Sequence, residues 1–319
     1  MKAAVYYETG GPEVFRFEEV PDPVCHPRGI VIGVEAVSIE GGDVLHRAGG
    51  ELVGRPHIVG YQCGGTILEV GDQVTDRAVG QRVVATMPHG SHAARVSVPV
   101  RSSWVVPEGL DIREAACVPI AFGTADDCLF EFGHLRAGET VLIQGGAGGV
   151  GLAAIQLAKR ARATVLATAS SDDKLERLRE FGLDHGINYR EQDLVPAMRK
   201  LTDGRGVDLV VDPVGTTLGD SLACLTYRGR AILVGNAGRA DTRIDVRPLM
   251  TGNQSLTGVY LGAEMGTERA YQMIAGHLAD VAKGTLRVVI DRTFPLSEAA
   301  EAHAYIESRR AFGRVVLVP

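Results

Sequence analysis

An apolar segment, Thr140–Gln144, runs directly into a turn in which five of the seven residues from 145 to 151 are glycine. The turn contains the spacing G-x-G-x-x-G, and a segment of small and apolar residues with helical spacing, Val150–Arg162, follows it. A chain that passes this abruptly from strand to helix needs residues without a Cβ atom at the turn. The motif therefore predicts a strand–turn–helix unit of a parallel sheet.

This turn is typical of a dinucleotide-binding site, because the amide groups at the helix N-terminus meet a pyrophosphate. Gly146 is expected to permit the tight turn, Gly148 to let the backbone approach the phosphates, and Gly151 to let helix and sheet pack closely. The alternative is a glycine-rich turn that holds no ligand. The residues expected to contact the cofactor here are Gly146, Ala147, Gly148, Gly149 and Val150.

The end of the second predicted strand, Thr164–Ala169, indicates which dinucleotide binds. A site that prefers NAD places an acidic residue about 20 residues after the turn, where it contacts the ribose hydroxyls. Here small neutral residues occupy that place, and Asp172 and Asp173 fit the first turn of the next helix, with Ser170 or Ser171 as its N-cap. Lys174 can contact a 2′-phosphate as a point charge. The sequence therefore favours NADPH.

The segments around this unit predict an α/β chain of two domains. The first 115 or so residues contain short apolar runs divided by turn signals, which is typical of a β-barrel or compact β domain. Strands and helices then alternate, which predicts a doubly wound parallel sheet. The expected strands are 3–7, 30–36, 65–70, 82–86, 94–98, 104–106, 140–144, 164–169, 185–188, 207–212, 230–234 and 255–258. The expected helices are 113–132, 150–162, 172–181, 193–201, 217–225, 247–252 and 268–284, with two short strands around 297–308.

Composition excludes several function classes. The net charge is −6 and the basic residues form no stripe, so nucleic-acid binding has no electrostatic support. No apolar run approaches the ~18–20 residues that span a bilayer, and the N-terminus lacks the apolar core of a signal peptide. The five isolated cysteines predict reduced, mostly buried thiols. We therefore expect a cytoplasmic protein that acts on a small molecule.

Several further motifs make the chain resemble the medium-chain dehydrogenase/reductase superfamily, and within it the zinc-independent quinone oxidoreductases. The segments that carry the resemblance are Gly10–Val14, Ala147–Gly151, Ile187–Arg190, Val210–Gly215, Arg228–Arg230, Val234–Asn236 and Glu307–Arg309. The resemblance implies a GroES-like domain of residues 1–118 and 259–319, a Rossmann domain of residues 119–258, and a homodimer joined through the Rossmann sheets.

The same resemblance implies roles for individual residues. Ser170, Lys174 and Tyr189 would surround the adenosine 2′-phosphate, and Thr124 would approach the nicotinamide. Val234 and Asn236 would flank the cofactor after a Rossmann strand. The residues expected to line the substrate pocket are Leu45, His92 and Tyr260.

The zinc-dependent branch of the superfamily has a Cys three residues before an Asp, and later a Gly-His-Glu triplet. Here Glu40 stands in place of that Cys, Tyr61 in place of the His and Gln62 in place of the Glu. Since Glu40 alone does not make a zinc site, we expect no metal. Quinone oxidoreductases usually have an Asn where Glu40 stands and a Tyr where Leu45 stands.

Without a metal, the expected reaction is hydride transfer from NADPH to a quinone or a similar activated carbonyl. One alternative is an enoyl or enone reductase that acts on a C=C bond conjugated to a carbonyl, including a thioester. A second is a non-catalytic NADPH-binding protein. Tyr61 and Glu40 are candidate catalytic residues that donate a proton to the reduced acceptor. Alternatively, Tyr61 packs against the barrel and Glu40 bonds to loop amides.

Overall fold

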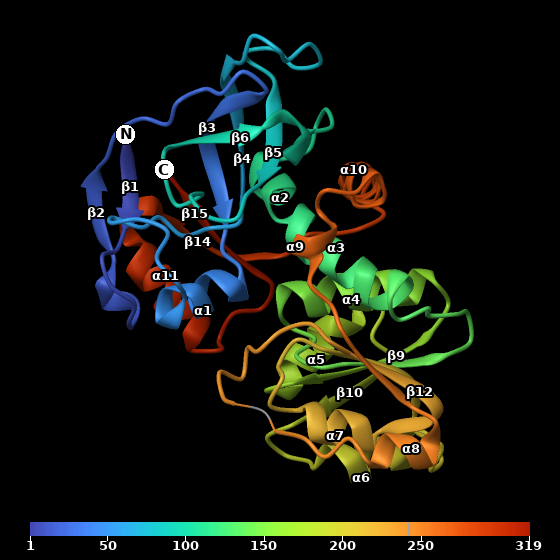
Figure 1. The fold of residues 1–319 in the computed structure, drawn as a ribbon. Helices are drawn as coiled ribbons and strands as arrows, with labels where there is room; N and C mark the ends of the chain where they lie inside the picture. The colour runs from blue at the N-terminus through green and yellow to red at the C-terminus, as the bar shows by residue number, and fades with distance from the viewer. Residues whose placement is uncertain (242) are drawn as a thin grey trace. The chain divides into compact units, whose positions relative to one another are not determined.

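The computed structural model describes residues 1–241 and 243–319, and the chain forms two compact units. The N-terminal unit combines residues 1–120 with residues 262–319, and the second unit is the continuous segment 121–261 (Figure 1). The sequence prediction divides the chain after residues 118 and 258. Each unit has its own sheet, and the two are described separately below.

The main sheet of the N-terminal unit has seven strands in the order β14-β15-β3-β4-β5-β7, and β6 also pairs with β3. All pairs are antiparallel except β14 with β15. A separate two-stranded sheet joins β1 (Lys2–Val5) to β2 (Arg16–Glu19). The strands of the main sheet are β3 (Gly29–Ser38), β4 (Gln62–Val70), β5 (Arg82–Thr86), β6 (Arg95–Pro99), β7 (Ser103–Val105), β14 (Ile290–Pro295) and β15 (Arg314–Val318).

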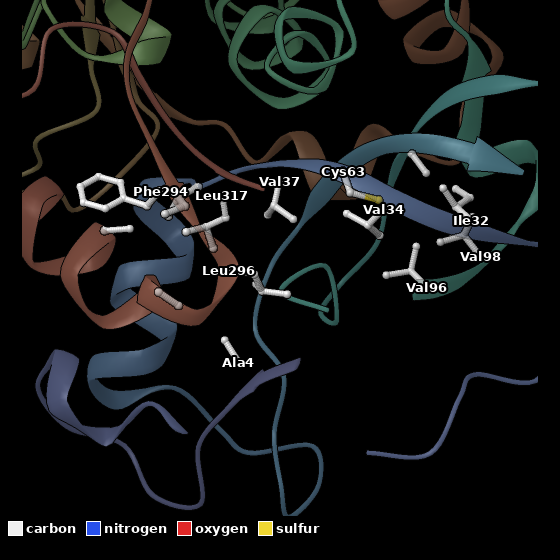
Figure 2. Packing of buried hydrophobic residues seen from close by; sticks show 14 of the residues in the cluster. Ala4, Ile32, Val34, Val37, Cys63, Val96, Val98, Phe294, Leu296 and Leu317 are labelled. Atoms are coloured by element: carbon white, nitrogen blue, oxygen red, sulfur yellow. The ribbon is translucent and has the colours of Figure 1, made fainter. Parts of the chain in front are cut away.

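The core of this unit joins the two ends of the chain. Figure 2 shows Phe294, Leu296 and Leu317 from the C-terminal segment in one cluster with Ala4, Val37 and other N-terminal side chains. Burying one such aliphatic side chain contributes ~1.5–3 kcal/mol. Because residues 262–319 supply part of this core, the N-terminal unit depends on both ends of the chain.

The helices of the N-terminal unit include two that the sequence analysis did not predict. Helix α1 (Gly41–Gly49) begins where a loop was expected, and the Asp43 carboxylate accepts the backbone N–H of Glu40 at 2.8 Å. The sequence does not predict this helix, because it starts with two glycines and glycine has low helix propensity. Helix α11 (Ala299–Glu307) lies between β14 and β15, so the two expected strands flank a helix. The remaining helices are α2 (Ile112–Ala116) and α10 (Glu268–Ala282), and α3 (Val118–Asp126) and α9 (Leu261–Glu264) cross the unit boundaries.

The second unit is built on a parallel sheet of six strands in the order β10-β9-β8-β11-β12-β13. The chain starts at β8, moves outward through β9 and β10, and then returns to the other side of β8 with β11. This order is that of a doubly wound Rossmann sheet, and it confirms the predicted fold class. The strands are β8 (Thr140–Ile143), β9 (Thr164–Ala169), β10 (His185–Asn188), β11 (Val207–Asp212), β12 (Leu225–Leu233) and β13 (Ser255–Gly258).

Helices connect these strands as the alternating pattern predicts. They are α4 (Gly149–Arg160), α5 (Asp172–Arg179), α6 (Leu194–Leu201), α7 (Leu218–Ala223) and α8 (Pro248–Gly252). A π-helical segment, Asp127–Glu131, follows α3. The reversal of direction between β8 and β11 matters most for function, because ligands bind beyond the carboxyl ends of the strands at this point.

Most expected strands agree with the structure, and β5, β9, β10, β11 and β13 have the predicted bounds. β12 is the main exception in the second unit, since it begins at Leu225 rather than Arg230. All five cysteines are free, and four of them are buried, as predicted. Among the described residues, no helix has the length and apolar character needed to cross a bilayer.

Candidate cofactor site and catalytic face

The glycines of the turn after β8 have different structural roles. Gly145 has a φ of +62°, so the left-handed residue stands one position before the predicted Gly146. A Cβ atom on Gly146 would lie 2.8 Å from Cβ of Ala167, so packing against β9 keeps this position glycine. A Cβ atom on Gly151 would lie 2.5 Å from the Gly145 carbonyl oxygen, so α4 approaches the turn as closely as expected.

Gly148 leaves the turn open on its outer side. It is exposed, and a Cβ atom there would meet only the Gly145 carbonyl oxygen, at 3.4 Å. Gly148 is also the N-cap of α4, and no side chain caps the helix. The amides of the first turn of α4 are therefore available to an anionic ligand, and the arrangement fits a pyrophosphate.

A hydrogen-bond network under the turn holds it in place. The Thr168 hydroxyl accepts the Gly145 N–H at 3.0 Å and donates to Gln144 Oε1 at 2.8 Å. Gln144 Nε2 donates to the Ser221 hydroxyl at 3.0 Å, and that hydroxyl donates to buried Asp212 at 2.8 Å. The network links the carboxyl ends of β9, β8 and β11, and buried networks of this kind hold one arrangement when every member has a partner.

Asp212 was not predicted as part of the site. Its carboxylate accepts the N–H groups of Val214 and Gly215, both at 2.9 Å, and the Thr217 hydroxyl, and so it shapes the turn after β11. An Asp at a strand end that is followed by a glycine turn is the signal that would have found it.

The predicted 2′-phosphate residues lie after adjacent parallel strands, β9 and β10. Ser170 and Lys174 are half-buried, and Tyr189 is 44% exposed. The Ser171 hydroxyl accepts the Lys174 N–H at 3.4 Å and so caps α5, and Asn188 Nδ2 donates to Asp172 at 3.1 Å. These contacts tie the start of α5 to the end of β10. Their arrangement fits a 2′-phosphate, because Ser170, Lys174 and Tyr189 offer donors and no carboxylate stands directly after β9.

The other residues expected near the cofactor lie elsewhere in the second unit. Val234 and Asn236 follow β12, and the Val234 N–H donates to the Asp212 carbonyl at 3.0 Å. Thr124 lies in α3 and is 8% exposed. All positions in the turns after β8, β9, β10 and β12 share one edge of the sheet, since the strands are parallel.

In the N-terminal unit, Glu40 belongs to a buried ion pair. Its Oε1 accepts hydrogen bonds from the guanidinium of Arg314 and from Gln62 Nε2. The same guanidinium donates to the Ser38 hydroxyl at 2.7 Å and to the Ile39 carbonyl at 2.8 Å. Burial raises the pKa of the Glu40 carboxyl, and Arg314 opposes that shift. The pair with Arg314 engages the Glu40 carboxylate, and a role of Glu40 as proton donor stays a prediction.

Tyr61 lies beside the first turn of α1. A Cβ atom on Gly42 would lie 2.6 Å from Cε2 of Tyr61, so this glycine makes room for the aromatic ring. Burial raises the pKa of Asp43 well above its usual range, and hydrogen bonds from the backbone of Glu40 and Tyr61 oppose the shift. Tyr61 is half-buried.

The three residues expected in the substrate pocket differ in exposure. Leu45 is half-buried on α1, and Tyr260 is 76% exposed. His92 is fully buried, and its Nε2 lies 3.1 Å from Nε2 of His303. Burial lowers the pKa of His92 to about 3, so the ring is neutral. Its place in the substrate pocket stays a prediction.

Across residues 1–241 and 243–319, no group of three or more His, Cys, Asp or Glu side chains is arranged to hold a metal ion. The Glu40 position, where the zinc branch has a ligand, is occupied by the ion pair with Arg314. The expectation of a zinc-independent protein remains a prediction.

The fold and the glycine turn define a dinucleotide-binding α/β protein with a separate β domain, and comparison with known proteins places it further. Residues 26–108 match the family described as alcohol dehydrogenase GroES-like domain, and residues 149–278 match the family described as zinc-binding dehydrogenase. The chain therefore contains the GroES-like domain that its motifs predicted.

Individual relatives cover nearly the whole chain. A 2-haloacrylate reductase of Burkholderia sp is 35% identical, over 99% of this chain and 98% of the relative. A quinone oxidoreductase of Pseudomonas aeruginosa is 32% identical, over 97% of each chain. The Escherichia coli quinone oxidoreductase in complex with NADPH is 27% identical, covers 100% of both chains and has a TM-score of 0.94. The chain belongs to the quinone oxidoreductase family of the medium-chain dehydrogenase/reductase superfamily.

Replacing Gly151 by Ala tests the close approach of α4 to the turn. The new Cβ atom meets backbone atoms of Gly145 and Gly146, which cannot move cheaply, so we expect a loss of ~1–3 kcal/mol in the free energy of unfolding. The matched control is Gly276→Ala in α10, where a Cβ atom meets nothing within 4 Å and a gain of up to about 1 kcal/mol is expected. Urea denaturation measures both variants, and an unchanged Gly151→Ala protein would contradict the packing argument.

Exchanging the carboxylate of Glu40 with the amide of Gln62 tests the electrostatics of the buried pair between Glu40 and Arg314. Glu40→Gln leaves Arg314 buried without a counter-charge, and we expect a loss of about 3–5 kcal/mol in the free energy of unfolding. The double variant Glu40→Gln, Gln62→Glu returns a carboxylate to the neighbourhood of Arg314 and is expected to recover at least half of the loss. Thermal and urea denaturation of the two variants decide this, and equal instability of both would refute the pairing.

Proposed function

We propose that this chain is an NADPH-dependent, zinc-independent oxidoreductase that transfers hydride to a quinone or to a related activated carbonyl compound. The observation that carries the proposal is the open glycine turn together with three hydrogen-bond donors, Ser170, Lys174 and Tyr189, which we call the Ser170 corner. NADPH supplies the hydride when it is bound. The relative of known structure that carries NADPH supports this choice of cofactor.

Each group of residues has a distinct part in this proposal. The backbone of residues 146–150 binds the pyrophosphate, and the Ser170 corner binds the 2′-phosphate. Thr124, Val234 and Asn236 contact the nicotinamide half of the cofactor. Positioning then accounts for most of the rate, because proximity and alignment of two bound reactants lower the barrier without a metal.

Tyr61 is the proposed proton donor to the reduced acceptor. Its ring is seated on Gly42 at the start of α1, and Leu45 lies one turn further along the same helix. Glu40 instead positions this region: through Arg314 it fixes the start of α1 relative to β15. Glu40 stands where quinone oxidoreductases usually have an uncharged Asn. Its negative charge neutralises the buried guanidinium of Arg314.

An enone or enoyl reductase is the second candidate. The Burkholderia sp relative is named for reduction of a 2-haloacrylate, whose C=C bond is conjugated to a carboxyl group, and it matches the full length of the chain. Leu45, where a Tyr is usual among the quinone oxidoreductases, also favours a pocket of different shape. Hydride transfer to a conjugated acceptor is common to both candidates.

A homodimer joined through the Rossmann sheets completes the proposal. Strand β13 is an edge strand of its sheet, so its outer side is open to a second copy of the chain. Exposed apolar side chains on the same unit support this assembly: Tyr227 is 67% exposed and Met250 is 73% exposed. Five free thiols accord with a cytoplasmic location.

A panel of acceptors tests the function directly. Oxidation of NADPH is followed with 1,2- and 1,4-quinones, simple enones and enoyl-CoA esters, and each acceptor is repeated with NADH. We expect turnover with at least one acceptor class and a kcat/KM for NADPH at least about tenfold above that for NADH, which corresponds to ~1.4 kcal/mol at the 2′-phosphate corner. A clear preference for NADH would overturn the cofactor assignment. Tight NADPH binding without turnover would instead favour a non-catalytic protein.

Replacing Tyr61 by Phe tests the proton donor. The variant keeps the ring on Gly42 and removes only the hydroxyl, so we expect kcat to fall at least about tenfold while NADPH affinity stays unchanged. The control is Tyr227→Phe, an exposed tyrosine of the other unit. Measurement of kcat from pH 6 to 9 on the preferred acceptor decides the matter, and an unchanged kcat throughout would remove Tyr61 from the mechanism.

A further inference from the structure

Three histidines that are distant in the sequence gather in the N-terminal unit. The rings of His46 and His57 are stacked, with centroids 4.8 Å apart and an interplanar angle of 17°, and the rings of His57 and His89 lie 5.6 Å apart. We call these three side chains the histidine cluster. Neither the proposed cofactor site nor the proposed proton donor uses them.

The cluster extends from the interior to the surface. His57 is 2% exposed, and its backbone is held by hydrogen bonds to Tyr6 in both directions, at 2.8 and 3.0 Å. His46 is half-buried, with Nδ1 3.0 Å from the Tyr6 hydroxyl, and His89 is exposed. The cluster therefore has one buried, one half-buried and one exposed member.

The inner histidine has an unused ring nitrogen. Nδ1 of His57 accepts the backbone N–H of Val53 at 3.2 Å, so Nε2 is the nitrogen that carries hydrogen in the neutral ring. Among the residues that the structure describes, no group accepts a hydrogen bond from this buried Nε2. A buried donor without a partner costs free energy, and a ligand that accepts a hydrogen bond removes that cost.

The cluster also lacks a counter-charge. Burial, together with the neighbouring His46 and His89, lowers the pKa of His57 to about 4. Burial and His89 lower the pKa of His46, and only a hydrogen bond to the backbone of Glu51 opposes this. Two charged residues of α1, Asp43 and Arg47, shift the pKa of Tyr6 instead. Arg47 also forms an ion pair with Glu307. Within the described part of the chain, no carboxylate shifts the pKa of His46 or His57.

The cluster lies next to the proposed catalytic tyrosine. Gly42, which makes room for the ring of Tyr61, and His46 are four residues apart on α1 and so lie on the same face of the helix. Tyr61 also acts electrostatically on Tyr6, the hydrogen-bond partner of His46. An acceptor molecule beside Tyr61 would thus have the histidine cluster one helical turn away.

We propose that His46, His57 and His89 form a binding site for a small carboxylate, and that this carboxylate belongs to the acceptor. The second clause rests on the proposed reductase function, and the first does not. A carboxylate supplies the two things that the cluster lacks: an acceptor for the buried N–H of His57, and a negative charge that favours the imidazolium form. Because burial keeps His57 neutral in the free protein, formation of an imidazolium beside the bound carboxylate takes up a proton from solution.

Calorimetry with a matched pair of probes tests the binding site. The protein saturated with NADP⁺ is titrated at pH 6.5 with propionate and with propionamide, its neutral isostere, in two buffers of different ionisation enthalpy. We expect propionate to bind with uptake of about one proton and propionamide to bind at least about tenfold more weakly. Equal binding of the two probes, or no binding of propionate, would overturn the proposal.

Variants assign the effect to the cluster. His57→Gln removes the buried ring, and His89→Gln alters only an exposed residue, so it keeps the test valid if the buried variant fails to fold. Each is expected to lower propionate affinity at least about threefold, while the control His26→Gln, an exposed histidine elsewhere in the unit, leaves it unchanged. Wild-type affinity in the His89→Gln protein would refute the participation of that residue and the cluster as defined.

A kinetic comparison separates the two clauses. With acrylate and methyl acrylate as acceptors, the KM of the acid is expected to rise as pH increases from 6 to 8, and that of the ester to stay constant. A pH-independent ratio of the two KM values would contradict the placement of the carboxylate of the acceptor. Absence of turnover with every acceptor would refute the reductase function, while the propionate titration would still report on the site.

Discussion

The buried pair between Glu40 and Arg314 is the interaction on which the N-terminal unit depends. It joins the residue that precedes α1 to the last strand of the chain, across 274 positions of sequence. Removing two charges from water is costly, and the cost is offset only when the remaining donors and acceptors are also satisfied. Here the guanidinium of Arg314 also donates to the Ser38 hydroxyl and the Ile39 carbonyl, and Gln62 donates to the Glu40 carboxylate. The pair thus connects the end of β3, the start of β4 and the start of α1. The proposed proton donor, Tyr61, directly precedes Gln62 in this arrangement.

The second unit depends on a different kind of constraint, namely the absence of side chains. Where Gly146 and Gly151 stand, backbone and side-chain atoms already occupy the space of a Cβ atom, while the space outside Gly148 is open. Close packing on the inner side and accessibility on the outer side come from the same short segment. Beneath it, Thr168, Gln144, Ser221 and Asp212 connect three strand ends, so the turn is held by polar contacts as well as by packing.

Local patterns in the sequence predicted most of the second unit, because its short strands alternate regularly with segments of helical spacing. β9, β10, β11 and β13 have the predicted bounds. The N-terminal unit was less predictable. Helix α1 starts with two glycines, whose propensity argues against a helix, and it forms because Asp43 caps it and Val44 packs into the core. Glu40 as an ion-pair partner and His57 as a buried donor depend on residues far away in the sequence, and no local pattern reports such contacts.

The discontinuity of the first unit has a consequence for synthesis of the protein. Residues 121–261 are continuous, so all of the parallel sheet is synthesised before residues 290–318. Until then β3 lacks its partner β15, and the guanidinium that neutralises Glu40 does not exist. Because domains fold as units during synthesis, the central domain is complete first and the domain that begins the chain is completed last. An mRNA truncated near its 3′ end therefore yields a chain in which the N-terminal domain, although fully encoded up to residue 120, lacks its closing strand.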